Sequence, residues 1–355
     1  MSQRKQLTTI LIKNVGLVWT MDEHRSKHSD VSVLIEGNKI TQIGKTIAKK
    51  VDRIIDGKGK VLLPGFINTH HHLFQAYMRH VPEIQNKPID VWIERVSELA
   101  LKMDKTAHYH AALANMVELV LSGCTTTSDM LYAFPKKYNH MELFAATVKA
   151  ASDLGIRFHP FRGSMSLSKK DGALFADAVV EDETEIVEHT AAVIGKFHDN
   201  SKESMLRVGI APCTVFTSSQ NDYMKASQLA EKYDVNLQTH LSESAYEQSY
   251  VFEKTGKLPL AYLQGCGWQT SRVSCVHGIE LTEDELEAMS KNGISLCHCP
   301  ISNARASLSQ KGIAPIWEAL EKNVTVSLGV DGSAGNDSSN MLEEMRWART
   351  MQGAR

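Results

Sequence analysis

From residue 61 onward the sequence alternates between short apolar runs and helix-like stretches, and this alternation constrains the fold more than any other feature. The apolar runs, which read as strands, are KVLLPGFIN, CTTTSDM, GIRFHPFRG, LRVGIAPC, VNLQTH, RVSCVH, GISLCHC and VTVSLGVD. The helix-like stretches between most of them are AHYHAALANMVELVLSG, HMELFAATVKAASDLG, DYMKASQLAEKYD, EDELEAMSKNG and APIWEALEKN. Several end in Gly or Asn, as helices commonly do. Eight strands alternating with helices predict an α/β fold, a (β/α)8 TIM barrel over residues 61–355.

Residues 1–60 have a different pattern. ILIKNVGLVWT, VSVLIEGNKITQIG and VDRIIDGKGKV are β-rich runs broken by Gly, Asn and Asp. We predict a small antiparallel β unit here, with a hairpin turn near Gly37-Asn38. Residues 81–104 and 163–205 read as insertions after strands one and three, and insertions at these strand ends usually shape the substrate mouth.

The bulk composition excludes several classes of protein. The formal net charge of -2 argues against nucleic-acid or anionic-membrane partners held by bulk electrostatics. No apolar stretch approaches the roughly 20 residues that a membrane span needs, and the N-terminus lacks a signal-peptide core, so we expect a cytoplasmic protein. The six cysteines are sparse and lie mostly in strand-like runs, so we expect reduced, buried thiols.

Histidines and carboxylates gather at the ends of the predicted strands. His70 and His72 follow strand one with one residue between them, so both can point the same way while His71 points elsewhere. His240 ends strand five and Asp331 ends strand eight. Because the C-terminal ends of barrel strands meet at one face, these groups should converge there. Imidazoles with one carboxylate suit Zn²⁺, and Fe²⁺ as well.

Two further groups at that face suggest hydrolytic chemistry. A divalent metal can bind water and lower its pKa to about 7, and Asp331 can accept the proton. Glu243 lies three residues past His240, where a carboxyl can protonate a ring nitrogen and then the leaving group; a helix cap is its alternative role. His277 ends strand six, where it can hydrogen-bond the attacking water and the intermediate. His298 ends strand seven, and a structural role suits it as well as a place in the pocket.

These residues lie in strings that resemble the amidohydrolase superfamily, in its mononuclear aminohydrolase branch: PGFINTHHH, SGCTTTSD, THLSES, VHG, HCPISN and GVDGSAGND. The resemblance implies a set of metal ligands and of catalytic residues, with His277 on the hydrolytic water. The implied ligands are His70, His72, His240 and Asp331, and the implied proton shuttles are Glu243 and Asp331. Two-metal relatives usually carry a modified Lys at the end of strand four, and APCTVF has none, so a single metal is expected.

Within the branch the chain is most similar to 8-oxoguanine deaminases and hydroxydechloroatrazine ethylaminohydrolases. Gln75 stands three residues after His72, as in guanine deaminases, and its amide can pair with an oxopurine edge. Cys213 stands where guanine deaminases have an Arg, which argues against plain guanine. Trp92 in the first insertion can stack on a flat ring. Gln75 and Trp92 have structural roles as their alternatives. The family's final helix and closing strands are missing, so we expect the C-terminal part of the β sandwich to be absent, through a fragment or a short gene product.

The expected function is metal-dependent hydrolytic deamination of an amino-substituted oxo-heterocycle, an EC 3.5.4-like reaction on a small molecule and water. An 8-oxopurine such as 8-oxoguanine is the first candidate substrate, followed by pterin, cytosine-like and hydroxytriazine rings. Displacement of an alkylamine or halide from a hydroxytriazine-type ring is the alternative reaction. A catalytically silent, truncated homologue is the alternative outside the enzyme class. A homodimer is expected only by analogy with the family.

Overall fold

The computed structural model describes residues 9–355 except 86, 88 and 307–312, so residues 1–8 of the predicted N-terminal unit lie outside the described residues. The chain divides into two compact units, Met1–Gly65 and Phe66–Arg355. The division lies five residues beyond the predicted boundary at residue 60, because one more short strand belongs to the first unit.

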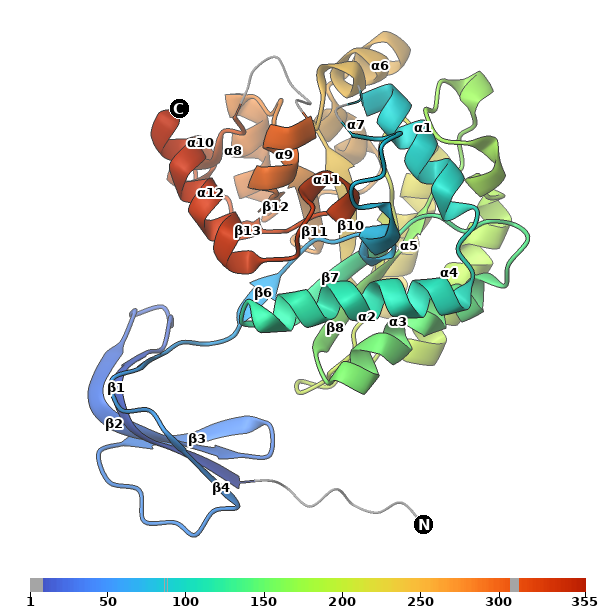
Figure 1. Cartoon of the computed structure of the whole chain (residues 1–355). Coiled ribbons are helices and arrows are strands. Elements are labelled where there is room, and N and C mark those ends of the chain that lie inside the picture. The colour runs from blue at the N-terminus through green and yellow to red at the C-terminus, as the bar shows by residue number, and fades with distance from the viewer. Residues whose placement is uncertain (1–8, 86, 88, 307–312) are drawn as a thin grey trace. The chain divides into compact units, whose positions relative to one another are not determined.

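The first unit is a mixed five-stranded sheet (Figure 1). Its strands are β1 (Thr9–Trp19), β2 (Lys27–Glu36), β3 (Lys39–Gly44), β4 (Arg53–Asp56) and β5 (Val61–Leu62). β1, β2 and β3 pair antiparallel, and the β2–β3 turn is Gly37-Asn38 as predicted, with Gly37 at φ 63°. β4 and β5 run parallel to β1, so the prediction of a purely antiparallel unit is wrong.

The second unit is built on eight parallel strands that pair in chain order. They are β6 (Phe66–Asn68), β7 (Cys124–Leu131), β8 (Arg157–Ser164), β9 (Gly209–Pro212), β10 (Leu237–Leu241), β11 (Val273–His277), β12 (Ser295–His298) and β13 (Val326–Leu328). The Thr69 amide donates to the Leu328 carbonyl at 3.1 Å, which joins the last strand to the first. The predicted (β/α)8 barrel is confirmed.

Helices follow the strands and pack around them (Figure 1). The described helices are α1 (Ile89–Ala100), α2 (Lys105–Leu121), α3 (His140–Leu154), α4 (Glu183–Phe197), α5 (Gln220–Tyr233), α6 (Ala245–Thr255), α7 (Pro259–Gly265), α8 (Glu283–Asn292), α9 (Pro300–Ala306), α10 (Ile316–Glu321), α11 (Ser333–Asn336) and α12 (Met341–Ala354). The two ends of α8 illustrate how helix boundaries can be predicted from the sequence. Thr282 and Glu285 form a capping box at its start, and Gly293 ends it in the left-handed conformation.

The two predicted insertions carry structure of their own. The first contains α1, and the second contains α4 and two short 3-10 helices, Lys169–Asp171 and Asp177–Val179. All six cysteines are buried with free thiols, as predicted. Among the described helices, none combines the length and the apolar character that crossing a bilayer requires.

Candidate metal centre and active site

His70 and His72 lie in the segment that leaves β6, and both are buried. Their rings stand at 85° to each other with centroids 4.7 Å apart. His71 between them turns away, and its Nε2 lies 2.9 Å from the Ser339 hydroxyl oxygen. Because one residue separates them, His70 and His72 both point into the barrel mouth. His71 points away from it, toward Ser339, as the sequence predicts.

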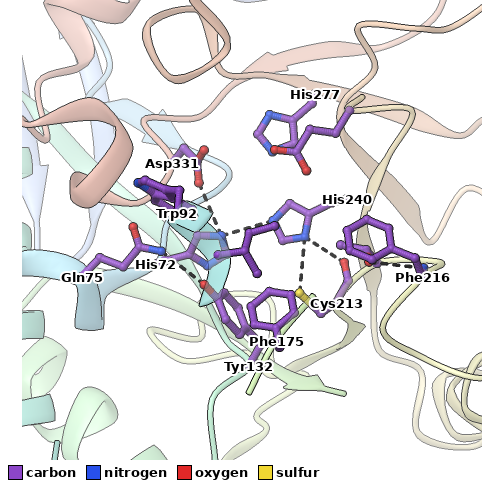
Figure 2. A pocket seen from close by; sticks show the side chains of 13 residues that line it. His72, Gln75, Trp92, Tyr132, Phe175, Cys213, Phe216, His240, His277 and Asp331 are labelled. Atoms are coloured by element: carbon purple, nitrogen blue, oxygen red, sulfur yellow. Dashed lines mark hydrogen bonds and ion pairs between the residues drawn. The ribbon is translucent and has the colours of Figure 1, made fainter. Parts of the chain in front are cut away.

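His240 meets these imidazoles from across the barrel, and Asp331 meets them from the neighbouring last strand. His240 Nε2 lies 3.2 Å from His72 Nε2 and 3.3 Å from His70 Nε2. Asp331 Oδ1 lies 3.4 Å from the Nε2 atoms of His70 and His72. Figure 2 shows His72, His240 and Asp331 pointing toward one another. Ligand atoms held about 2.0–2.1 Å from one tetrahedral ion stand roughly 3.3 Å apart, so the separations fit a shared cation.

The hydrogen bonds on the other ring nitrogens establish which atoms face the centre. His72 Nδ1 lies 2.9 Å from the Met130 carbonyl oxygen, and His240 Nδ1 lies 2.8 Å from that of Cys213. A carbonyl can only accept, so each Nδ1 carries the proton and each Nε2 offers a lone pair. Facing lone pairs at this distance repel unless a cation lies between them. The donor set therefore fits a divalent metal held by nitrogen and oxygen.

The protonation states of the four ligand residues agree with a site for a divalent metal. Burial lowers the pKa of His72 to about 3 and holds that of His240 well below its ordinary range, so both rings are neutral, the form that binds metal. Burial also opposes the charge of Asp331, but the hydrogen bond from His70 and the neighbouring imidazoles outweigh it and keep the Asp331 pKa well below its usual value. His70 shows the matching rise in pKa, because Asp331 outweighs its burial. A positive charge is thus favoured where the ion would lie.

Glu243 and His277 form a second pair beside this centre. His277 ends β11, and its Nε2 lies 3.4 Å from Glu243 Oε1. His277 also stacks on His240, with centroids 5.4 Å apart, and its nitrogen comes within 4.8 Å of ligand atoms of His70 and His240. Burial raises the pKa of Glu243, so this carboxyl holds a proton more readily than a surface glutamate. The turn that carries Glu243 is organised by Glu247, whose carboxylate accepts from the amides of Ser242 and Glu243, both at 2.9 Å.

A small cavity of about 50 Å³ lies above these groups. It is lined by His72, Gln75, Trp92, Ile93, Tyr132, Phe175, Cys213, Thr214, Phe216, His240, Glu243, His277 and Asp331 (Figure 2). The structure therefore brings together the residues that the predicted catalytic, metal and substrate sets name; His70 does not line the cavity, but its ligand atom lies among those of the other predicted ligands. The backbone carbonyl of Cys213 accepts a hydrogen bond from His240 Nδ1. Burial raises the pKa of the Cys213 thiol above the ordinary range.

Several lining residues were not found from the sequence. Tyr132 directly follows β7, so the rule that chemistry lies at strand C-terminal ends could have identified it. Phe175 and Phe216 lie further into loops, where no periodic pattern marks a residue that faces the cavity. His298 does not line the cavity; it is buried, its ring nitrogens have no hydrogen-bond partner, and burial lowers its pKa to about 4.

Comparison with known proteins is consistent with this geometry. Hydroxydechloroatrazine ethylaminohydrolase from Pseudomonas sp. (strain ADP) is 28% identical over 358 residues, which cover 98% of this chain and 73% of that protein. A crystal structure of atrazine chlorohydrolase from Arthrobacter aurescens TC1, complexed with zinc, superposes with a TM-score of 0.91 at 32% identity, covering 97% of this chain and 76% of that one. The 8-oxoguanine deaminase of Pseudomonas aeruginosa is 32% identical over 327 residues, which cover 91% of this chain and 72% of that protein. The model of the amidohydrolase family matches residues 61–354, and the chain belongs to this family.

Proposed function

We propose that this enzyme hydrolytically deaminates an amino-substituted oxo-heterocycle, with 8-oxoguanine or a related purine or pterin as the first candidate substrate. The observation that supports this most is the meeting of four ligand atoms next to the Glu243–His277 pair, in which His70 Nε2 and His72 Nε2 each lie 3.2–3.4 Å from His240 Nε2 and from Asp331 Oδ1. The deaminases among its relatives support a hydrolase of C–N bonds other than peptide bonds.

In this proposal one divalent ion, Zn²⁺ first and Fe²⁺ second, is held by His70, His72, His240 and Asp331. When bound, such an ion acidifies water and so supplies a nucleophile at neutral pH. Gln238 Oε1 accepts a hydrogen bond from His70 Nδ1 at 2.9 Å, and it fixes that ring as the two carbonyls fix the others.

The protein's own groups then move the protons. The water oxygen forms a bond to the ring carbon that bears the amine, and the water proton passes to the ionised Asp331 carboxylate. Glu243, which holds its proton because it is buried, donates it to the adjacent ring nitrogen. His277 Nε2 accepts a hydrogen bond from the attacking water. The deprotonated Glu243 takes the remaining hydroxyl proton and donates it to the amine, so the C–N bond breaks, ammonia leaves and the new C–O bond becomes a carbonyl. The proton held by Asp331 then returns Glu243 to its protonated form.

The cavity walls support a flat, neutral ring as substrate. Among the described residues that line the cavity there is no Lys or Arg, so no cationic side chain of these types is present to pair with a phosphate or carboxylate. Trp92 offers an aromatic face, and Gln75 offers an amide whose Oε1 accepts from the Ala334 amide at 3.3 Å. The Gln75 Nε2 group therefore points toward Tyr132 Oη, at 3.3 Å, and can donate to an oxo group. Cys213 leaves neutral the position that an Arg would charge.

A second candidate is displacement of an alkylamine or halide from a hydroxytriazine-type ring. The similarity to hydroxydechloroatrazine ethylaminohydrolase and to the zinc complex of atrazine chlorohydrolase favours it. The same nucleophile serves both reactions, and only the leaving group differs.

The test is turnover of a panel of rings by protein reconstituted with Zn²⁺ or Fe²⁺: 8-oxoguanine, guanine, an aminopterin-type ring, cytosine and N-alkyl hydroxytriazines. We expect ammonia from an oxopurine or pterin, and a fall of at least roughly 100-fold in kcat for Glu243→Gln with its metal content retained. Glu253→Gln, an exposed carboxyl on α6, is the control and should keep full activity. Release of alkylamine alone favours the second candidate, and one metal per chain with no turnover favours a silent homologue.

A further inference from the structure

Two adjacent residues in the first turn of α9, Ser302 and Asn303, contact Asp331 and His277. Ser302 Oγ donates to Asp331 Oδ2 at 2.5 Å. Asn303 Oδ1 lies 2.8 Å from His277 Nδ1. Both side chains are buried, and neither residue lines the cavity. They therefore act on Asp331 and His277 and do not contact the substrate.

Asp331 and His277 are residues that need such support. Each has a positive φ, 61° for Asp331 and 76° for His277, in the left-handed region that side chains with a Cβ rarely adopt. Conformations of this kind persist only where surrounding contacts hold them. The Asp331 amide donates to the His70 carbonyl at 3.1 Å, but that bond leaves the carboxyl group free to rotate.

Ser302 determines which carboxylate oxygen faces the imidazoles. Asp331 Oδ2 takes the Ser302 hydroxyl, while Oδ1 accepts from the Gly332 amide at 2.6 Å and lies against His70 and His72. With Oδ2 engaged, only Oδ1 is directed at the ion position, so the carboxylate would bind through one oxygen.

Asn303 determines the tautomer of His277. Its Oδ1 can only accept, so the proton of a neutral His277 lies on Nδ1 and the lone pair on Nε2. Nε2 is the atom that faces Glu243. His277 is then able to accept from the attacking water or from the Glu243 carboxyl, as the proposed mechanism requires.

The turn itself is anchored from outside the site. The Ile301 amide donates to Glu344 Oε2 of α12 at 3.4 Å, and Asn336 Nδ2 donates to Glu344 Oε1 and to the Val330 carbonyl, both at 2.5 Å. These bonds connect α9 to α12 and to the residue that precedes Asp331. The positions of Ser302 and Asn303 are thereby fixed relative to the strand end that carries Asp331.

We propose that Ser302 and Asn303 are paired positioning residues, which together hold Asp331 as a one-oxygen ligand and His277 as the Nδ1-protonated tautomer. The inference rests on the proposed function for its effect on rate. The binding of Asp331 through one oxygen and the tautomer of His277 can both be measured without turnover. Each can therefore be confirmed or refuted separately from the substrate assignment.

For Asn303 the readout is the ¹⁵N chemical shifts of the imidazole rings in labelled, zinc-loaded protein, with His277 assigned by comparison with His277→Gln. We expect the Nδ1–H tautomer in wild type and in Asn303→Asp, whose carboxylate can only accept, and a mixture in Asn303→Ala. On a ring that the enzyme turns over, kcat should fall about 10- to 100-fold in Asn303→Ala with KM nearly unchanged, and Asn303→Asp should recover most of it. An Nε2–H tautomer in wild type, or equal losses in Ala and Asp variants, overturns the claim.

For Ser302 the readout is the visible spectrum of the Co²⁺-substituted protein, which reports ligand number and geometry. Ser302→Ala should change the spectrum and lower kcat about 10-fold, whereas Ser302→Thr, which keeps the hydroxyl, should restore both. Ser227→Ala, on an exposed hydroxyl bonded to the Gly267 carbonyl outside the site, is the matched control and should keep the wild-type spectrum. An unchanged spectrum in folded Ser302→Ala, or no recovery in Ser302→Thr, contradicts the role of this hydroxyl.

Discussion

Asp129 is a buried carboxyl in β7 with a single hydrogen-bond partner. The Leu73 amide donates to its Oδ1 at 2.8 Å, and its Oδ2 has no partner. Burial raises its pKa to about 7, above the ordinary 3.8. The folded state therefore holds this proton more tightly than the unfolded chain. The resulting contribution to the free energy of unfolding is complete below about pH 4. It decreases by up to about 4 kcal/mol as the pH rises to about 7.

Asp129→Asn, which cannot ionise, should remove this loss. The difference in unfolding free energy between the variant and the metal-free wild type should move in the variant's favour as the pH rises from 4 to 7. Denaturant titrations across that range measure it. Asp153→Asn, at an exposed carboxyl bonded to Lys149, is the control and should follow the wild type. A constant difference between Asp129→Asn and wild type would show that Asp129 is ionised throughout.

The residues of the site differ in how far the sequence could identify them. His70, His72, His240 and Asp331 could be placed together because each follows an apolar run, and parallel strands in a barrel end at one face. Ser302 and Asn303 could not, because they lie in a helix turn after β12 and act through side-chain bonds to residues 29 and 26 positions away. Nothing in a local pattern encodes such a pairing.

At the scale of elements, the eight barrel strands were predictable, and the end of the first unit was not. The run Val61–Leu63 reads as one strand with Phe66–Asn68, yet Val61 and Leu62 pair with β1 and only the residues after Pro64-Gly65 enter the barrel. Both strands are short and apolar, so their partners depend on tertiary pairing and not on composition. The helices α6 and α7 after β10 were also not assigned, although Ser244 caps α6 through the Glu247 amide.

The two insertions meet over the site. The Ala176 amide donates to Ser97 Oγ of α1 at 3.0 Å, next to Phe175, while Trp92 lies on the same helix. The cavity of about 50 Å³ between these walls has room for a few waters, whereas pockets that hold drug-sized ligands have about 300–1,000 Å³. We infer that the walls separate to admit a ring, and the Ser97–Ala176 bond opposes that movement.

Ser97→Ala should weaken the contact between the insertions. Leaving the Ala176 amide unpaired costs about 1–3 kcal/mol, so we expect a changed KM with kcat within about twofold of wild type, since no catalytic group moves. Steady-state kinetics on whichever ring is turned over give both values. Glu98→Ala, which breaks the exposed Arg95–Glu98 pair on the same helix, should leave KM unchanged. An equal effect in both variants would assign the change to α1 in general and not to this bond.

At the scale of the whole molecule, the ligand set connects the first, fifth and eighth strands of the barrel. His70 and His72 follow the first strand, His240 ends the fifth and Asp331 follows the eighth, so one ion would join segments that are 261 positions apart between His70 and Asp331. An ion that binds only the folded chain stabilises it in proportion to the logarithm of its concentration over Kd, by about 4 kcal/mol at 1,000-fold excess. Metal content should therefore govern thermal stability as well as activity.

Chelation should lower the unfolding temperature of the wild type, and added Zn²⁺ should restore it. His72→Ala removes one lone pair from the set and should lose most of this response to zinc. His71→Ala is the matched control: it deletes the neighbouring imidazole, whose bond is to Ser339, and should unfold at a lower temperature yet keep the full zinc-dependent shift. Calorimetry with and without zinc separates the two effects. The same zinc response in His72→Ala as in His71→Ala would mean that the ion binds elsewhere, and the assignment of the metal centre would fail with it.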